Sequence, residues 1–254
     1  MANTYFIVGN EYSAFSVASN VVTACEFLDR LERGETFNDD HIVFGLGINE
    51  SQRSSIARKL AAGSTANILH YIQPASCELT HKLSTQNNLI SEPRKLGNGR
   101  YEFDLILFDH KDRLSDHVTG QHVGAMIQLE AARQAAIAAT ELEYSETCGF
   151  DISIVVEKFT SLFHGYMFPL PVTLLATLDE TARSDNRISV TCPVTLSQAG
   201  TVISKMYLEG GVLPRNFLQI VEMRQARRAV AAATKHHAPT SSVTPDPVLE
   251  HCTA

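Results

Sequence analysis

Residues 116–136 read DHVTGQHVGAMIQLEAARQAA. Beyond Val123 this stretch is apolar or small on nearly every side, which predicts a buried helix over about residues 123–143. Three polar residues interrupt it. Glu130, Arg133 and Gln134 share one helical face, because positions i, i+3 and i+4 lie one above another. Burying polar groups costs free energy unless they are hydrogen-bonded, so these three residues need partners or a function. The helix is therefore the starting point for predicting both the fold and the candidate site.

Two hypotheses explain that polar face. In the structural one, Glu130 and Arg133 form an internal salt bridge and Gln134 bonds to a neighbouring segment. In the functional one, Gly120 and Gly124 leave room for a ligand at the start of the helix, where backbone N–H groups can stabilise the oxyanion formed from a thioester. Glu130 would then be an acid or base whose pKa is raised through desolvation by apolar neighbours, namely Met126, Ile127 and Leu129.

The segments around this helix predict strands. Residues 80–90 have an extended pattern, and residues 100–108 alternate between apolar and polar side chains, as in a half-buried strand. Further strands are predicted at 152–156, 170–178, 186–196 and 202–209, the last two as a hairpin across residues 198–200. Two strands, one buried helix and a run of antiparallel strands is the order of a hotdog fold, in which a curved sheet wraps a central helix. We therefore expect a single α+β hotdog domain over residues 77–213.

Strands and helices alternate in the first part of the chain. Strands at 5–8, 41–47 and 66–72, with helices at 21–31 and 50–62, predict a small α/β domain over residues 1–74 with a three-stranded parallel sheet. Gly45-Leu46-Gly47 matches part of a dinucleotide-binding fingerprint, but position 50 is Glu instead of Gly, so we favour a tight turn. A C-terminal helix is predicted over 214–235, followed by a disordered tail over 236–254.

The composition limits the partners. A net charge of −7 argues against nucleic-acid binding, and the locally basic residues 215–228 are expected to be a solvated helix face. Five cysteines, an odd number without CxxC spacing, argue against a disulfide framework or a structural zinc site and favour a cytoplasmic location. No apolar stretch is long enough to span a bilayer, so no membrane partner is expected.

The helical stretch resembles the signature of the AfsA-type (A-factor biosynthesis) hotdog family. Thr80-His81-Lys82 is similar to the His-Lys pair that opens the family's domain, and His110 falls near the family's histidine after the second strand. The resemblance covers residues 78–209 and is strongest around the helix. Typical family members contain two hotdog repeats, whereas this sequence indicates one, so we expect a homodimer that completes the two-hotdog unit.

The resemblance implies acyl transfer. A β-ketoacyl group would leave a carrier-protein or coenzyme A thioester and esterify the hydroxyl of a C3 phosphate such as dihydroxyacetone phosphate, in the biosynthesis of butenolide or butyrolactone signals or related natural products. The helix start near Gly124 would hold the thioester carbonyl, and Glu130 or His122 would take the proton of the hydroxyl. The phosphate would bind to a basic side chain, which is Arg133, Lys82 or His81. Neither a metal nor another cofactor is required.

The same helix also resembles that of the β-hydroxyacyl-carrier-protein dehydratases, whose motif ends in Glu-Ala-x-x-Gln. In those enzymes a histidine lies fourteen residues before the glutamate, but here that position is Asp116, with His117 adjacent. The arrangement at residues 116–122 is equally similar to that of hotdog thioesterases. Asp116 in substrate binding and His117 in catalysis are therefore further candidates. A hotdog thioesterase or dehydratase, and a non-catalytic domain that binds an acyl ligand or carrier protein, remain the alternatives.

Overall fold

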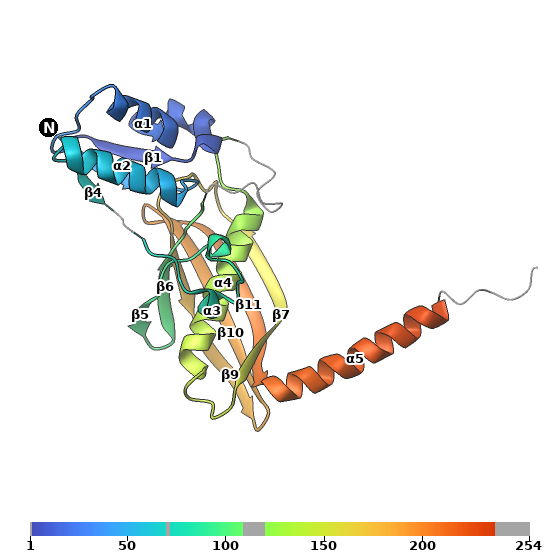
Figure 1. Cartoon of the computed structure of the whole chain (residues 1–254). Helices are drawn as coiled ribbons and strands as arrows, with labels where there is room; N and C mark the ends of the chain where they lie inside the picture. The colour runs from blue at the N-terminus through green and yellow to red at the C-terminus, as the bar shows by residue number, and fades with distance from the viewer. Residues whose placement is uncertain (1, 70–71, 109–119, 237–254) are drawn as a thin grey trace, which may run out of the picture. The chain divides into compact units, whose positions relative to one another are not determined.

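The computed structural model describes residues 2–69, 72–108 and 120–236. The chain divides into two compact units, one ending at Pro214 and the other beginning at Arg215. The first unit holds two sheets, and the second contains helix α5, Arg215–His236 (Figure 1). The tail predicted to be disordered lies outside the described residues from 237 onward. No helix in the described part of the chain has the length and apolar character needed to cross a membrane.

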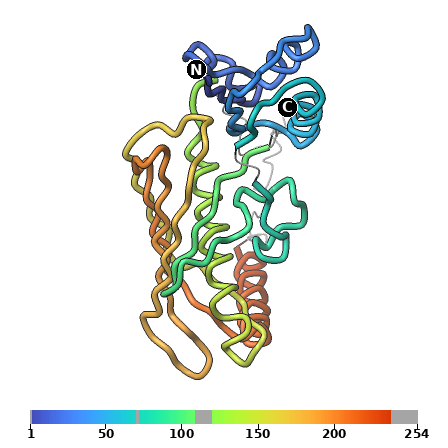
Figure 2. Tube along the Cα trace, turned by 90° about the vertical axis from the view of Figure 1, so that its left-hand side faces the viewer, coloured from blue at the N-terminus to red at the C-terminus, as the bar shows by residue number. Residues whose placement is uncertain are grey.

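The larger sheet has seven antiparallel strands that curve around helix α4, Ala125–Tyr144 (Figure 1). The order of the strands is β5-β6-β8-β10-β11-β7, and β9 pairs with β10. Helix α4 lies along this sheet and packs against strands that include β6, β7, β8, β10 and β11 (Figure 2). The bounds of the strands are β5 Arg94–Gly97, β6 Arg100–Asp104, β7 Ile152–Phe163, β8 Thr173–Thr177, β9 Asp179–Ser184, β10 Arg187–Gln198 and β11 Thr201–Pro214. The predicted hotdog architecture, with an antiparallel sheet and a central helix, is thereby confirmed.

Small side chains let α4 lie close to the sheet. Five alanines along it are almost fully buried, at positions 131, 132, 135, 138 and 139. On the facing strand β10, every second residue is buried, which is the pattern of a strand with one face on a core. The larger apolar groups that fill the remaining space come from the strands, and they include Phe103, Leu174, Val194, Leu196 and Met206.

The smaller sheet has four parallel strands in the order β2-β1-β3-β4, not the three that the sequence predicts. The additional strand is β2, Val21–Thr23, which we expected to begin a helix. Helix α1 starts one residue after it because the Thr23 side chain accepts a hydrogen bond from the backbone N–H of Glu26 and so caps the helix. The other elements are β1 Thr4–Val8, η1 Asn10–Val17, α1 Ala24–Glu32, β3 His41–Phe44, α2 Glu50–Gly63 and β4 Asn67–Leu69.

The Gly45–Gly47 turn joins the two sheets of the first unit. The N–H of Leu46 donates to the carbonyl of Pro169, and the N–H of Gly47 donates to that of Leu107. A Cβ atom on Gly45 would lie 2.2 Å from the Pro169 oxygen, so only glycine permits this approach. Leu46 is buried in the core of the larger sheet. The glycine pair is thus a tight turn, as predicted, and its further role is to bring two backbones together.

The segment before β5 is not extended, contrary to the expectation for residues 80–90. It forms a short helix, α3 Cys77–Thr80, and a 3₁₀ turn, η2 Thr85–Asn87. The Ser76 side chain caps α3, and His81 ends it in the left-handed conformation with φ of 54°. The Thr80 hydroxyl donates to the Asn88 side chain over 2.7 Å, inside the core. Local capping thereby overrides the weak strand pattern.

Replacing Gly210 tests the contact between β7 and β11. A Cβ atom there would lie 2.1 Å from the Val155 carbonyl oxygen, next to a shift in the pairing register. We expect Gly210→Val to lower the free energy of unfolding by about 1–3 kcal/mol through overpacking, as measured by chemical denaturation. Gly63→Ala is the control, because a Cβ there meets nothing within 4 Å. Equal stability of the two variants would contradict this packing.

Candidate functional site

The Glu130 carboxylate is held by three side chains. Arg133 donates to it from Nε and from a terminal guanidinium nitrogen, each over 2.8 Å. The Lys82 ammonium lies 2.5 Å from Oε1, and the Gln134 amide donates to the same oxygen over 3.0 Å. The Glu130 side chain is 16% exposed. The salt bridge predicted between Glu130 and Arg133 is present. Lys82 is a second cation at Glu130; it is one of the residues predicted for the site, but this ion pair was not predicted.

The prediction that the pKa of Glu130 is raised was wrong. Burial does push the pKa of this carboxyl upward, but the hydrogen bonds from Arg133, Lys82 and Gln134 together outweigh burial and lower the pKa to about 2. The apolar residues expected to desolvate Glu130 also do so incompletely, because Met126 is 52% exposed. Glu130 is therefore an anion throughout the neutral range, and its basicity is weak.

Gln134 fastens the segment before β5 to α4. Its side-chain oxygen accepts the backbone N–H of Leu89 over 2.8 Å, and its amide nitrogen donates to the carbonyl of Asn87 over 2.9 Å. The residue is fully buried. A second tie lies one to two turns further along the helix, where His81 Nε2 is 2.7 Å from the Glu141 carboxylate. His81, Lys82 and Gln134 thus all connect the α3 region to α4.

A separate cleft opens at the start of α4. Its volume is about 390 Å³, and it is lined by His122, Val123, Ala125, Gln128 and the 163–167 segment, Phe163, His164, Gly165, Tyr166 and Met167. The rings of His122 and Tyr166 lie 4.9 Å apart. Gln128 is buried and accepts a hydrogen bond from the Ser204 hydroxyl over 2.9 Å, so its orientation is fixed. The cleft combines two imidazoles with apolar walls, a composition typical of sites for small molecules.

The two glycines of the predicted site have different surroundings. Gly124 is the N-cap of α4 and contributes no capping side chain. Gly120 packs against the small-sheet region: a Cβ on it would lie 3.1 Å from the Cβ of Ala14, and its carbonyl accepts the N–H of Phe15. The remaining candidates, Asp116 and His117, lie outside the described residues, as does His110.

The structure separates the predicted residues into two groups. Gln128 lines the cleft, and Glu130 follows it by two residues, which is about 200° around an α-helix. Glu130, Arg133, Gln134 and Lys82 thus form one cluster, and His122 belongs to the cleft on another side of α4. Sequence reasoning missed His164 and Tyr166. The sequence shows these two residues only as part of a loop between two predicted strands. No local pattern indicates that they lie beside His122, some forty residues earlier.

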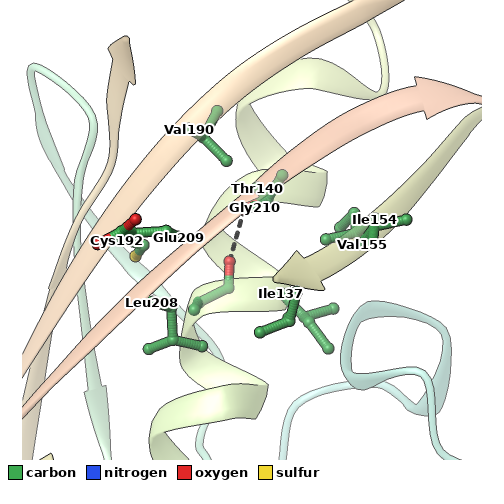
Figure 3. Close-up of a pocket in the computed structure, with 11 residues that line it drawn as sticks. Ile137, Thr140, Ile154, Val155, Val190, Cys192, Leu208, Glu209 and Gly210 are labelled. Atoms are coloured by element: carbon green, nitrogen blue, oxygen red, sulfur yellow. Dashed lines mark hydrogen bonds between the residues drawn. The ribbon is translucent and has the colours of Figure 1, made fainter. Parts of the chain in front are cut away.

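A second, much smaller cavity lies between α4 and the sheet (Figure 3). Its volume is about 20 Å³, roughly enough for one water molecule. Apolar residues of β7, β10 and β11 line it, and the Thr140 hydroxyl donates within its own helix, to the carbonyl of Ala136 over 2.7 Å. Burial raises the pKa of the Cys192 thiol there to about 12, so this cysteine stays protonated and is no nucleophile.

Comparisons with known proteins agree with this architecture. A family model described as the A-factor biosynthesis (AfsA) hotdog domain matches residues 63–214, which is more than half of the chain. No curated protein matches.

Solved structures similar to this chain include a mutant thioesterase from Pseudomonas aeruginosa, with 13% identity over 49% of this chain and 81% of that one and a TM-score of 0.39. A Shewanella oneidensis protein provisionally described as a thioesterase has 12% identity over 54% of this chain and 87% of its own, with a TM-score of 0.40.

The pH dependence of stability tests the Glu130 cluster. The pKa of this carboxyl is about 2 in the folded chain, below its ordinary value of 4.5. Ionised Glu130 therefore stabilises the fold above about pH 4.5, and this contribution is lost as the pH falls toward 2. We expect Glu130→Gln to lower the free energy of unfolding by about 3 kcal/mol near pH 7, with a difference that shrinks below about pH 4.5.

Denaturation curves at several pH values measure that difference. Glu146→Gln, at an exposed position just beyond the same helix, is the control and should match the unchanged chain. A Glu130→Gln variant as stable as the unchanged chain near neutral pH would show that the cluster does not stabilise the fold.

Proposed function

The chain belongs to the A-factor biosynthesis (AfsA) hotdog family, and we propose that it is an acyltransferase. It would move a β-ketoacyl group from the thioester of an acyl carrier protein, or of coenzyme A, to the hydroxyl of a C3 phosphate such as dihydroxyacetone phosphate. The product would lead to butenolide or butyrolactone compounds. The observation that carries this proposal is the cleft at the start of α4, where His122 lies beside the helix N-terminus and the apolar side chains of Phe163 and Met167.

The helix N-terminus suits a thioester carbonyl. The first N–H groups of a helix have no acceptor within the helix and point toward the space in front of it, where the helix dipole favours negative charge. Gly124 caps α4 without a side chain that would occupy that space. When the acceptor hydroxyl attacks the carbonyl carbon, the oxyanion forms there and is stabilised; the C–S bond then breaks and the thiolate leaves.

The base in this step would be His122. The attacking hydroxyl must lose its proton, and histidine is the side chain that most often accepts a proton in general base catalysis. Glu130 is the weaker candidate, because Arg133 and Lys82 hold its pKa at about 2 and because it does not line the cleft. We therefore assign Glu130 to positioning α3 and its neighbours against the helix.

The basic side chains of the Glu130 cluster and its surroundings are the candidates that the sequence offers for the acceptor's phosphate. Lys82 and Arg133 together carry one positive charge more than Glu130 neutralises. A guanidinium offers a planar fork for phosphate oxygens. These groups and the cleft lie on different sides of α4, however, and a C3 phosphate is shorter than the width of a helix with its side chains, about 10–12 Å. An acceptor whose hydroxyl meets His122 would therefore leave its phosphate beyond the reach of Lys82 and Arg133.

Three other functions are compatible with the same residues. With water in place of the acceptor hydroxyl, the cleft would support a thioesterase, and the family's fold also hosts dehydratases. A domain that only binds an acyl ligand or a carrier protein is the third possibility. The arrangement of an imidazole beside a helix N-terminus favours attack on a carbonyl, by the acceptor hydroxyl or by water, over simple binding, which needs no base.

Mass spectrometry distinguishes these functions. We expect incubation of the protein with a β-ketoacyl thioester to give an ester only when dihydroxyacetone phosphate is present. His122→Ala should reduce this turnover by roughly 10²–10⁴-fold, the usual contribution of a positioned proton-transfer group. His41→Gln, a histidine of strand β3 that does not line the cleft, is the matched control. Free acid or loss of water in place of the ester would replace the transferase with a hydrolase or a dehydratase, and no turnover would leave a binding domain.

We also propose that the protein is a homodimer formed along β7. This strand is an edge of the larger sheet, and an unpaired edge readily accepts another strand. It exposes four large apolar side chains, those of Val156, Phe159, Leu162 and Phe163. Phe163 also lines the cleft, so a second copy at this edge would cover the cleft from water.

Light scattering tests the dimer. At micromolar concentration we expect twice the chain mass of 27.9 kDa. Val156→Glu with Leu162→Glu should shift the mass toward that of one chain, because paired carboxylates would be desolvated at the contact. The control is Leu96→Glu, at an exposed apolar position of β5 at the opposite edge. A monomer before any substitution would rule out this dimer.

A further inference from the structure

Helix α5 exposes apolar side chains that no described residue of its own unit covers. None of its residues is buried. Four large apolar residues are strongly exposed: Phe217, Ile220, Met223 and Val230, between 42% and 67%. Its second half is rich in alanine and arginine, which favour the helix without help from packing. The helix is thus formed by local propensity, and its exposed apolar groups are available to a partner.

The same helix is strongly basic in an otherwise acidic chain. Residues 215–236 contain five basic residues and one acidic residue, a net charge of +4, whereas residues 1–214 contain 16 basic and 25 acidic residues, a net charge of −9. Arg224, Arg227 and Arg228 are exposed, and within the described part of the chain they take part in no ion pair. The field around α5 therefore attracts an acidic partner.

The arrangement of these groups favours a protein partner. Phe217, Val221, Arg224 and Arg228 follow one another at positions i, i+4, i+7 and i+11, so apolar and cationic groups share a single stripe. A helix that lies on a membrane separates an apolar face from a cationic one, which α5 does not do. A mixed stripe matches an amphipathic protein surface that offers carboxylates next to apolar side chains.

We propose that α5 is the docking element for the acidic carrier protein that delivers the acyl thioester. This inference rests on the proposed acyltransferase function and names the form in which its donor arrives. Proteins that carry acyl thioesters on a prosthetic arm are small, helical and acidic, so the arginines of α5 would pair with their carboxylates while Phe217 and Ile220 contact their apolar side chains. Such pairing speeds encounter and selects the partner.

Charge reversal on α5 tests the proposal. The variant Arg224→Glu with Arg227→Glu and Arg228→Glu keeps good helix formers, and circular dichroism checks its helicity. With a carrier-bound β-ketoacyl thioester, we expect kcat/KM to fall roughly tenfold or more at low salt, mainly through KM. With the N-acetylcysteamine thioester of the same acyl group, kcat/KM should not change. Raising NaCl from about 0.05 M to about 0.5 M should lower the kcat/KM of the unaltered protein toward that of the variant. This should occur with the carrier-bound thioester and not with the N-acetylcysteamine thioester.

Matched controls separate docking from overall charge and from helix loss. The variant Arg33→Glu with Arg58→Glu and Arg100→Glu makes the same charge change at exposed positions of the first unit. It should leave kcat/KM unchanged with both thioesters. The triple arginine-to-alanine variant of α5, which preserves the helix most securely, should show a smaller loss in the same direction. A charge-reversed α5 that uses the carrier as well as the unaltered protein would overturn the proposal.

A binding measurement that needs no turnover distinguishes failure of the docking proposal from failure of the proposed function. Anisotropy of a labelled holo carrier protein should report binding that the charge-reversed α5 loses. If the unaltered protein binds the carrier but turns over neither thioester, the acyltransferase proposal fails and the docking surface stands. If it binds vesicles that contain phosphatidylglycerol and not the carrier, α5 is a membrane element and the docking proposal is wrong.

Discussion

The close packing of an alanine-rich helix against a curved sheet is the constraint on which the rest of the larger domain depends. Buried alanines along α4 keep the helix near the strands, so the sheet can wrap it with bulky side chains supplied mainly from its own side. This arrangement leaves the two ends and the outer face of α4 free for polar groups. The start of the helix opens into the cleft that contains His122, and its outer face carries Glu130. Both candidate sites are thus consequences of where the sheet does not cover the helix.

The Glu130 cluster shows how hydrogen bonds keep a carboxylate ionised on a largely apolar helix. One carboxylate between Lys82 and Arg133 loses hydration but gains two cations and an amide donor, and the balance keeps it ionised. Together with Gln134, which satisfies the backbone of Asn87 and Leu89, it fixes a segment that has little regular structure of its own. In a protein, specificity for one arrangement of a loop is a sufficient reason for such a network.

The fold was predictable from the sequence wherever periodicity was strong. The alternation of β10 and the long apolar helix indicated a hotdog domain, and the family match agrees. The short strand β2 was missed because it depends on pairing with β1, and the helix α3 was missed because it depends on one capping side chain, that of Ser76. The site was less predictable. Helical spacing grouped Glu130 with Arg133, but the ionisation of Glu130 depends on Lys82, 48 residues earlier, and the meeting of His122 with Tyr166 depends on the return of the chain after β7.

The hydrogen bonds from the Gly45–Gly47 turn have a consequence for how the first unit unfolds. The core of the larger sheet includes four residues from the smaller sheet and its connections, Val8, Tyr12, Val21 and Leu46. The carbonyls of Leu107 and Pro169 accept hydrogen bonds from the N–H groups of that turn. Cutting the chain between the sheets would expose apolar surface on both pieces and strip two carbonyls of their partners. We therefore expect both sheets to unfold as one cooperative unit, because the loss of either sheet would remove contacts that stabilise the other.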